Sequence, residues 1–106
     1  MNISHRDIKL ENILVDMESE NLETKIIDFG FSVQTKAPEK IRSFCGTPAY
    51  MAPELCLKTE YYGPVVDVWA IGVVFYTMLF GNQPWKCMSD LRIIVKIFSF
   101  KEYELI

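Results

Sequence analysis

Two short strings decide the fold of this chain: His5-Arg6-Asp7-Ile8-Lys9-Leu10-Glu11-Asn12 and, after an interval, Asp28-Phe29-Gly30. Between the strings lie the apolar runs Ile13–Val15 and Lys25–Ile27, which the acid-rich residues 16–24 separate from each other. Apolar runs on either side of a polar stretch predict a β-hairpin with a long solvated loop. The first string therefore precedes this hairpin, and the second follows it.

Composition restricts the class of protein. The chain has 106 residues, half of them hydrophobic, and a net charge of −3. This is room for one small folded domain, residues 1–106, and the negative charge argues against a nucleic-acid binder. Three cysteines, Cys45, Cys56 and Cys87, show no C-x-x-C spacing, so neither a disulfide framework nor a zinc site is expected. We expect an intracellular protein of the cytoplasm.

The rest of the chain predicts short elements and further helices. Phe31–Val33 is predicted as one more strand, and residues 34–42 as a mobile polar loop. Pro53 suits the first turn of a short helix that ends near Lys58. A last helix is predicted after Ser89, with these residues on its apolar face: Leu91, Ile94, Val95 and Phe98. The expected class is α+β, mainly helical.

The most apolar stretch is Val65–Phe80, and its apolar residues fall on every side of the predicted helix. A helix of this kind is expected to be surrounded by protein. It is short for a membrane span and it carries Asp67, so a buried helix is favoured and no membrane span is expected. Met1 is followed by polar residues, so no signal peptide is expected at the start.

Each feature of the two strings has an ordinary explanation when it is taken alone. Asp7 and Arg6 could form a surface ion pair, Asn12 could cap a helix, and Asp28-Phe29-Gly30 could be a simple turn. The order of the strings, with a predicted hairpin between them, is much more specific than any one of these features.

Further strings extend the pattern over most of the chain: Cys45-Gly46-Thr47-Pro48-Ala49-Tyr50-Met51-Ala52-Pro53-Glu54, Asp67-Val68-Trp69-Ala70-Ile71-Gly72 and Pro84-Trp85. With them, the chain resembles the C-terminal lobe of a eukaryotic protein kinase, with a small β-hairpin at the catalytic cleft. Lys9 and Gly46-Thr47 are similar to the residues of serine/threonine kinases at these positions. The sequence of the strings is most like that of calmodulin-dependent and AMP-activated kinase relatives. The resemblance implies ATP, Mg²⁺ and a protein substrate with a serine or threonine acceptor.

The resemblance implies roles for individual side chains. Asp7 takes the proton of the attacking hydroxyl, Lys9 contacts the transferring phosphate of ATP, and Thr47 hydrogen-bonds to both residues. Asn12 and Asp28 supply oxygen ligands to Mg²⁺, and together with Lys9 they bind the nucleotide.

Substrate and regulatory positions are implied as well. Gly46 and Thr47 belong to the loop that docks the substrate peptide, and Glu11 stands where kinases of basic substrates place an acid. Arg6 pairs with a phosphate on the activation loop, and Ser43 is the expected residue for it. An ordinary loop hydroxyl at Ser43 is the alternative.

Three further contacts are implied for support. The carboxylate of Asp67 is expected to accept backbone amides around His5 and Arg6, since burying it without partners would be costly. His5 is expected to pack near Phe29 and not to act as a base. Glu54 would normally pair with an arginine further downstream than this chain reaches.

The matched strings do not include the glycine-rich loop over ATP, the lysine strand or the glutamate that pairs with that lysine. Two hypotheses remain open. In the first, the chain is a catalytic-lobe part of a serine/threonine kinase, with doubtful activity by itself. In the second, it is a truncated, non-catalytic kinase that acts as a decoy or scaffold for kinase partners or substrates. An N-terminal lobe or another partner is expected to cover the central helix.

Overall fold

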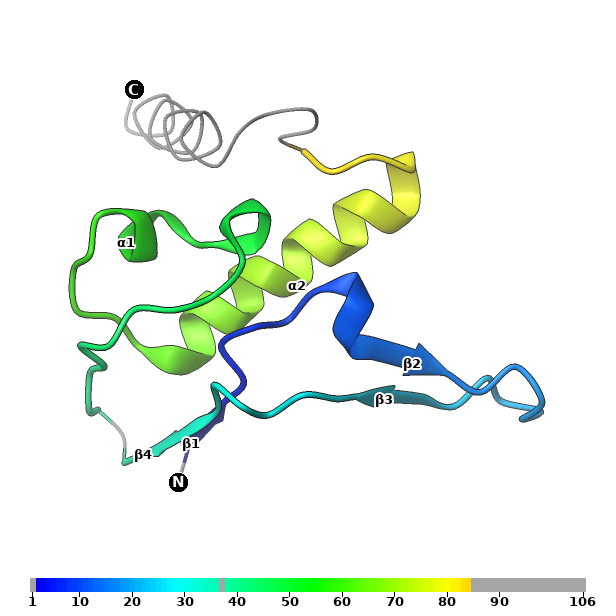
Figure 1. Ribbon diagram of the computed structural model, residues 1–106, viewed down its shortest axis with the longest axis horizontal. Helices are drawn as coiled ribbons and strands as arrows, with labels where there is room; N and C mark the ends of the chain where they lie inside the picture. Colours follow the sequence, from blue (N-terminus) through cyan, green and yellow to red (C-terminus); the bar gives the residue numbers. More distant parts are fainter. Residues whose placement is uncertain (1, 37, 85–106) are drawn as a thin grey trace.

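The computed structural model describes residues 2–36 and 38–84 (Figure 1). In chain order its strands and α-helices are β1 (Asn2–Ser4), β2 (Ile13–Val15), β3 (Thr24–Ile26), β4 (Val33–Thr35), α1 (Pro53–Cys56) and α2 (Gly63–Phe80). Single 3₁₀ turns occupy Leu10–Asn12 and Pro48–Tyr50. The described part of the chain is thus α+β, as expected. The helix predicted after Ser89 lies outside the described residues.

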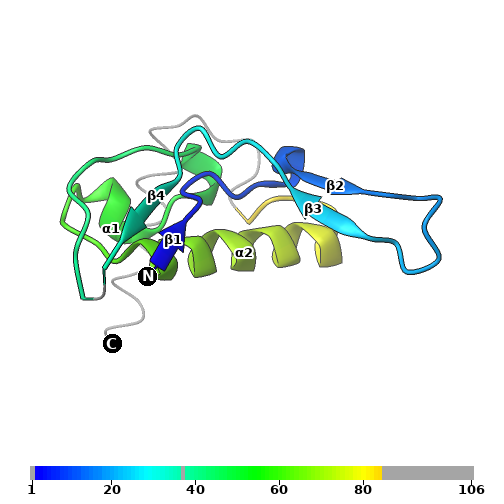
Figure 2. The ribbon, with the colours of Figure 1, turned by 90° about the horizontal axis from the view of Figure 1, so that it is seen from below.

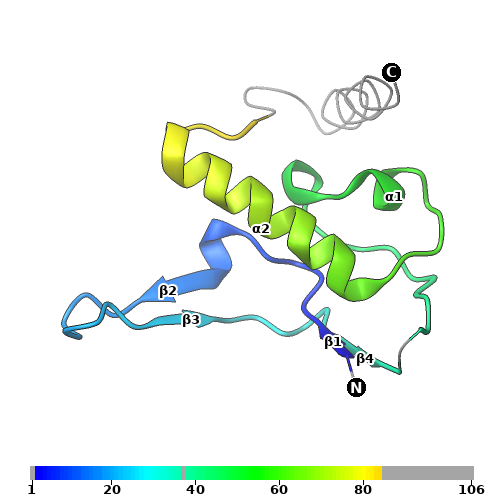
Figure 3. The same ribbon diagram turned by 180° about the vertical axis from the view of Figure 1, so that it is seen from behind.

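The strands form two separate antiparallel pairs. In the hairpin, β2 pairs with β3, with Ile13 opposite Ile26 and Val15 opposite Thr24. The hairpin was predicted, and its second strand begins one residue earlier than expected. It projects from the rest of the described chain, and almost all side chains of its loop are exposed (Figures 1 and 3).

The second pair corrects the sequence prediction. A strand was expected at Phe31–Val33 and a mobile loop at 34–42, but the strand is Val33–Thr35 and it pairs with β1, which was not predicted. Within the predicted loop, Ile41 forms an antiparallel bridge with Tyr61. The prediction was wrong here because strands of three residues carry no periodic pattern, and each partner is far away along the chain.

Helix α2 begins and ends where local chemistry requires. Pro64 occupies its first turn, where the missing N–H costs nothing. Gly81 ends it with φ of 75°, a left-handed conformation that glycine adopts easily, and its N–H donates to the Thr77 carbonyl at 2.8 Å. The predicted helix is confirmed, with a start two residues earlier at Gly63.

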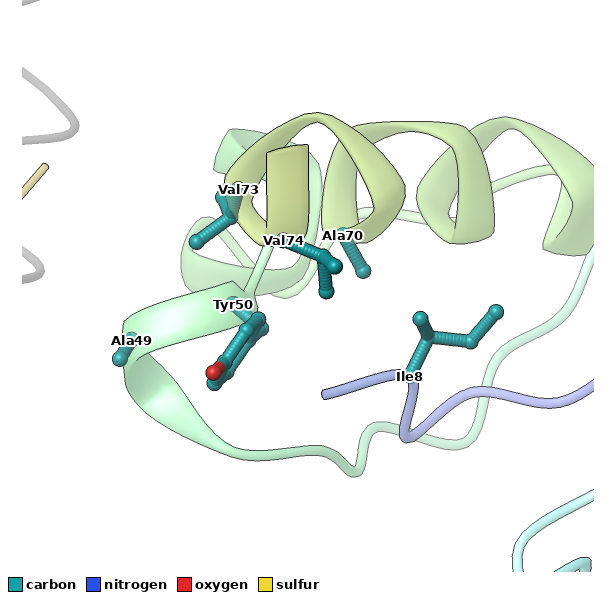
Figure 4. Close-up of a cluster of buried hydrophobic side chains, with 6 residues drawn as sticks. All are labelled: Ile8, Ala49, Tyr50, Ala70, Val73 and Val74. Atoms are coloured by element: carbon teal, nitrogen blue, oxygen red, sulfur yellow. The ribbon is translucent and has the colours of Figure 1, made fainter. Parts of the chain in front are cut away.

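The core lies along one side of α2, in two clusters that both contact Trp69. The first joins α2 to the 3₁₀ turn at 48–50 and to the chain after Asp7 (Figure 4); its buried members are Ile8, Ala49, Tyr50, Ala70, Val73 and Val74. The second packs α2 against α1 and the Ile41–Tyr61 bridge; its buried members are Ile41, Ala52, Leu55, Tyr61 and Val66. Helix α2 therefore holds together segments that are distant in sequence.

The opposite side of α2 is apolar and exposed in the described chain. Its exposed apolar residues are Val65, Val68, Ile71, Phe75, Tyr76, Met78, Leu79 and Phe80. By length and composition alone, α2 could cross a membrane, and a core helix of a soluble protein meets the same criterion. The exposed side agrees with the expectation that α2 is apolar all round.

The first turn of α2 passes directly against β1 (Figure 2). Ser4 is fully buried there, and its hydroxyl has no hydrogen-bond partner among the described residues. An ideal Cβ placed on Gly63 would lie 1.9 Å from the Ser4 Oγ atom. Only a residue without a side chain allows the helix to approach β1 this closely.

Candidate active site

Asp67, on α2, anchors the chain immediately after β1. Its two carboxylate oxygens accept the backbone N–H groups of His5 at 2.8 Å and of Arg6 at 3.0 Å, as expected. Arg6 has φ of 69°, which is uncommon for a residue with a side chain. Because the carboxylate holds both amides, it stabilises a bend that the chain would otherwise resist.

His5 uses both ring nitrogens within the fold. Its Nδ1 accepts the Asp7 backbone N–H at 3.1 Å, so the proton of the neutral ring lies on Nε2, which donates to the Ile27 carbonyl at 2.8 Å. The ring also meets Phe29 edge-on, with centroids 4.9 Å apart, which confirms the expected contact. His5 therefore links the first string to the residues that precede the second.

Asp7, Lys9 and Thr47 lie together. The Thr47 hydroxyl donates to Asp7 Oδ1 at 2.8 Å, and Lys9 Nζ donates to Thr47 Oγ1 at 3.1 Å. Lys9 Nζ also lies 3.8 Å from Asp7 Oδ2. Both hydrogen bonds expected of Thr47 are present. Since Lys9 is extended, with φ of −160° and ψ of 165°, its ammonium group stays beside the buried Asp7 carboxylate.

Asn12 and Asp28 offer two oxygen atoms of the kind that magnesium prefers. The buried Asn12 amide donates from Nδ2 to the Asp7 carbonyl at 2.9 Å, so its own carbonyl oxygen is the end left for a cation. Asp28 is exposed, and its Oδ1 accepts the Gly30 N–H at 3.2 Å. Magnesium keeps much of its water shell, so one amide and one carboxylate oxygen fit it. The described residues contain no group of three or more His, Cys, Asp or Glu side chains that could hold a metal by itself.

The backbone at Asp28 was not anticipated. The residue with positive φ in this turn is Asp28, at 60°. Aspartate tolerates this region better than most residues because its short polar side chain can bond locally, as Asp28 does with Gly30.

Of the residues predicted to contact the substrate, Gly46 lies close against the first string, whereas Glu11 is exposed. Gly46 has φ of 126°, and a Cβ there would lie 3.3 Å from the Arg6 carbonyl oxygen, so a glycine is required beside the first string. Glu11 is exposed on the 3₁₀ turn, and in the described part of the chain it forms no hydrogen bond or ion pair with the Asp7–Lys9–Thr47 group.

Arg6 and Ser43 meet. Arg6 Nε donates to the Phe31 carbonyl at 2.6 Å, and Arg6 Nη1 donates to the Ser43 hydroxyl at 2.8 Å. Sequence reasoning missed a third partner: the Tyr61 hydroxyl accepts from Arg6 Nη1 at 3.3 Å and donates to the Ser43 carbonyl at 2.6 Å. Two adjacent tyrosines before Gly63 give no signal of which one turns inward.

The Cys45 thiol lies close to this group. Burial raises its pKa, and the nearby Asp7 and Asp67 carboxylates raise it further, while the Arg6 guanidinium opposes them. Burial also raises the pKa of Cys56. Because folding favours the protonated thiols, the stability gained is complete below the unfolded pKa and is lost as the pH rises through the folded pKa.

We predict slow alkylation of these two thiols. At pH 8, iodoacetamide should modify Cys45 and Cys56 more slowly in the folded chain than in urea, because less thiolate is present. The rate in the folded chain should rise at a higher pH than in the unfolded chain. Mass spectrometry of the two peptides measures both rates, and equal rates at every pH would contradict the prediction.

Comparison with known proteins gives the family of the chain. A family model for the protein kinase domain matches residues 1–104. The chain is 48% identical over 89 residues to the phosphorylase b kinase gamma catalytic chain, liver/testis isoform, of Mus musculus. This match covers 79% of the chain and 21% of that protein. It is 45% identical over 91 residues to the "Probable serine/threonine-protein kinase MARK-C" of Dictyostelium discoideum, covering 86% of the chain and 11% of that protein.

A third relative matches a larger share of the chain. Sperm motility kinase 3A of Mus musculus is 41% identical over 99 residues, which cover 93% of the chain and 19% of that protein. The chain thus spans between 11% and 21% of the length of these three relatives. Since the family model matches almost every residue and the relatives include named serine/threonine kinases, the chain belongs to the protein kinase domain family.

Proposed function

We propose that this chain forms the phosphate-transfer part of a serine/threonine protein kinase, in the position of the C-terminal lobe. The reaction is transfer of the ATP γ-phosphate to a serine or threonine hydroxyl of a protein. The observation that carries the proposal is the contact of Asp7 and Lys9 with Thr47, because it joins a base, a cation and a docking segment at one place. Members of the family generally use ATP and Mg²⁺.

Each of the three side chains has a task that its contacts suit. Asp7 holds the acceptor hydroxyl and takes its proton, and the Thr47 hydroxyl fixes the carboxylate through Oδ1. The Lys9 ammonium, beside the same carboxylate, stabilises negative charge on the phosphate that is transferred. Because Thr47 bonds to both, it keeps the base and the cation at a fixed separation.

Asn12 and Asp28 would hold the magnesium ion. When bound, the ion neutralises charge on the ATP phosphates. Asn12 is oriented for this by its bond to the Asp7 carbonyl, so the metal ligand and the base move together. Asp28 is carried next to this region by the His5 contacts with Ile27 and Phe29.

We predict that Asp28→Asn weakens nucleotide binding. Loss of the carboxylate should lower the Mg²⁺-dependent affinity for ATP by about tenfold or more, since a charged metal ligand is replaced by a neutral one. Titration calorimetry with and without Mg²⁺ measures the change. Asp16→Asn, in the hairpin loop, is the matched control, and equal affinities of the two variants would count against the assignment.

The remaining positions concern the substrate and control of activity. Gly46 and Thr47 are proposed to dock the acceptor peptide, and exposed Glu11 is proposed to favour a basic one. Arg6 and Ser43 are proposed as the regulatory pair, because the exposed Ser43 hydroxyl already lies 2.8 Å from the guanidinium. A phosphate on Ser43 would strengthen this contact.

Ser43→Ala should therefore lower transfer in the native protein. Arg6 would lose its hydroxyl partner and the site for a phosphate, so the segment that leads to Thr47 would be held less firmly. Phosphate transfer to a peptide, compared with wild type, measures the effect. Full activity of the variant would show that Ser43 is an ordinary loop hydroxyl.

The proposed function is tested with Asp7→Asn. The native protein is isolated from cells with an antibody to the exposed residues 16–24, and transfer from γ-labelled ATP to a basic serine peptide is measured. Wild type should transfer phosphate, and Asp7→Asn should lose at least about a hundredfold of the rate, the usual contribution of a positioned base. Asp16→Asn is the control for expression and capture. Equal rates for Asp7→Asn and wild type would refute the assignment of the base.

A second candidate function rests on the exposed apolar side of α2. Exposed apolar area of this kind favours a partner, so a decoy or scaffold role for kinase partners or substrates is the alternative. It would be favoured if the isolated wild-type protein bound a kinase substrate but neither it nor Asp7→Asn transferred phosphate.

A further inference from the structure

Two loop segments, residues 40–43 and residues 60–62, lie side by side. The first leads towards Thr47, and the second leads into α2. Ile41 and Tyr61 exchange backbone hydrogen bonds, with N···O distances of 2.8 Å and 3.2 Å. On either side, Arg42 Nε lies 2.6 Å from Glu60 Oε1, and Lys40 Nζ lies 5.3 Å from the centre of the Tyr62 ring. Both side contacts are largely exposed, so they add little to the stability of the pair.

In contrast to these exposed contacts, Tyr61 is buried, and its hydroxyl contacts both Ser43 and Arg6. Tyr61 is 3% exposed, whereas the adjacent Tyr62 is 43% exposed. The hydroxyl donates to the Ser43 carbonyl at 2.6 Å and accepts from Arg6 Nη1 at 3.3 Å. If either neighbour moves away, the Tyr61 hydroxyl loses that bond, and leaving a buried donor or acceptor unpaired is costly.

The geometry points to Tyr61 as a positioning residue that holds the segment around Ser43 against Arg6. Together with the Ile41–Tyr61 backbone bonds, this hydroxyl lets the loop before α2 set where residues 40–43 lie. Thr47 follows four residues after Ser43 and donates to Asp7, so the position of this segment reaches the proposed catalytic base. The expected effect on phosphate transfer rests on the proposed function. The positioning of residues 40–43 by Tyr61 does not depend on it.

The hydroxyl, and not the ring, is the active group in this inference. The Tyr61 ring packs in the second core cluster and meets the Phe44 ring at 6.0 Å between centroids. Tyr61→Phe keeps this packing and removes only the hydroxyl. The matched control is Tyr62→Phe, which removes a hydroxyl from the neighbouring, exposed ring and keeps the ring under Lys40.

Two measurements on the full 106-residue chain test the inference. Hydrogen exchange of the Ile41 and Tyr61 amides should become about tenfold faster in Tyr61→Phe, because a buried hydrogen bond to a segment is lost. Trypsin cleavage after Arg42 should rise by a similar factor, while cleavage after Lys25 in β3 should not change. Exchange of the α2 amides should also stay unchanged, since a local hold does not alter the global fold.

The variants separate the possible outcomes. Tyr62→Phe should match wild type, and Ser43→Ala should have a smaller effect than Tyr61→Phe, because it leaves the bond from Tyr61 to the Ser43 carbonyl in place. If Tyr61→Phe and Tyr62→Phe behave alike, the inference is overturned. It is also overturned if Tyr61→Phe loosens α2 and the hairpin together, since the hydroxyl would then serve the whole fold.

Transfer kinetics give a readout that packing alone would not change. In the native protein, Tyr61→Phe should raise the KM for the peptide about tenfold and leave the KM for ATP unchanged, because the segment leads to the docking residues. An equal change in both KM values would overturn the link to docking. If the native wild type transfers no phosphate while exchange and cleavage respond as expected, the proposed function fails and the inference about the segment stands.

Discussion

Alanine at position 63 is expected to separate α2 from β1. The added Cβ would lie 1.9 Å from Ser4 Oγ and 2.6 Å from Ser4 Cβ, and neither atom can yield because Ser4 is fully buried. We expect Gly63→Ala to lower the free energy of unfolding by about 3 kcal/mol or more, at the upper end of overpacking effects. Urea unfolding followed by far-UV circular dichroism measures the change.

The same helix offers a matched control. A Cβ on Gly72 would meet nothing within 4 Å, so Gly72→Ala should be neutral or stabilise by up to about 1 kcal/mol through helix propensity. Adding Ser4→Gly to Gly63→Ala removes both overlapping atoms and should restore much of the loss. If Gly63→Ala unfolds at the same urea concentration as Gly72→Ala, the close approach does not govern the position of the helix.

Removal of the Asp67 carboxylate is expected to release the chain at His5 and Arg6. Asp67→Ala leaves both backbone amides without an acceptor, and each bond to a charged group contributes about 1.5–3 kcal/mol. We expect a loss of about 3 kcal/mol in the free energy of unfolding and much faster hydrogen exchange of the two amides. Arg6 should then leave its positive φ more readily, because its backbone N–H no longer has the carboxylate that offsets the strain.

Asp67→Asn tests the charge separately from the shape. Its amide oxygen can accept one of the two N–H groups, but its NH₂ group faces the other, so its stability should fall between those of wild type and Asp67→Ala. Asp16→Ala, in the exposed hairpin loop, controls for the loss of an acid. If Asp67→Asn were as stable as wild type and kept both amides protected, the anchoring role would be wrong.

Local patterns were sufficient to predict some parts of the fold. The β2–β3 hairpin follows from two apolar runs and a polar stretch, and α2 follows from Pro64, a long apolar run and Gly81. The proximity of Asp7, Lys9 and Thr47 was expected from the kinase resemblance, and their hydrogen bonds agree with it. The roles of these residues in transfer are not tested by their contacts and stay predictions.

Other features depend on partners that no local pattern reveals. Polar Thr35 is buried on β4, which pairs with β1 about 30 residues earlier in the chain, and the composition of neither strand predicts this pairing. Tyr61 and Tyr62 are adjacent residues of the same type, so the sequence does not distinguish them. Only the positions of Arg6 and Ser43 in the fold decide which of the two hydroxyls forms the hydrogen bonds. Likewise Gly63 has a steric task that is visible only once Ser4 lies beneath it.

The anchoring of the first string by α2 has a consequence for the order in which the molecule is assembled. Asp67 bonds to His5 across 62 positions of the chain, and Thr47 bonds to Asp7 across 40. Contacts between such distant residues form late, because long loops must close before the contact stabilises anything. During synthesis the first string leaves the ribosome well before its anchor. A nascent chain that stalled before residue 67 would carry every proposed catalytic side chain and lack the carboxylate that bends the chain into place.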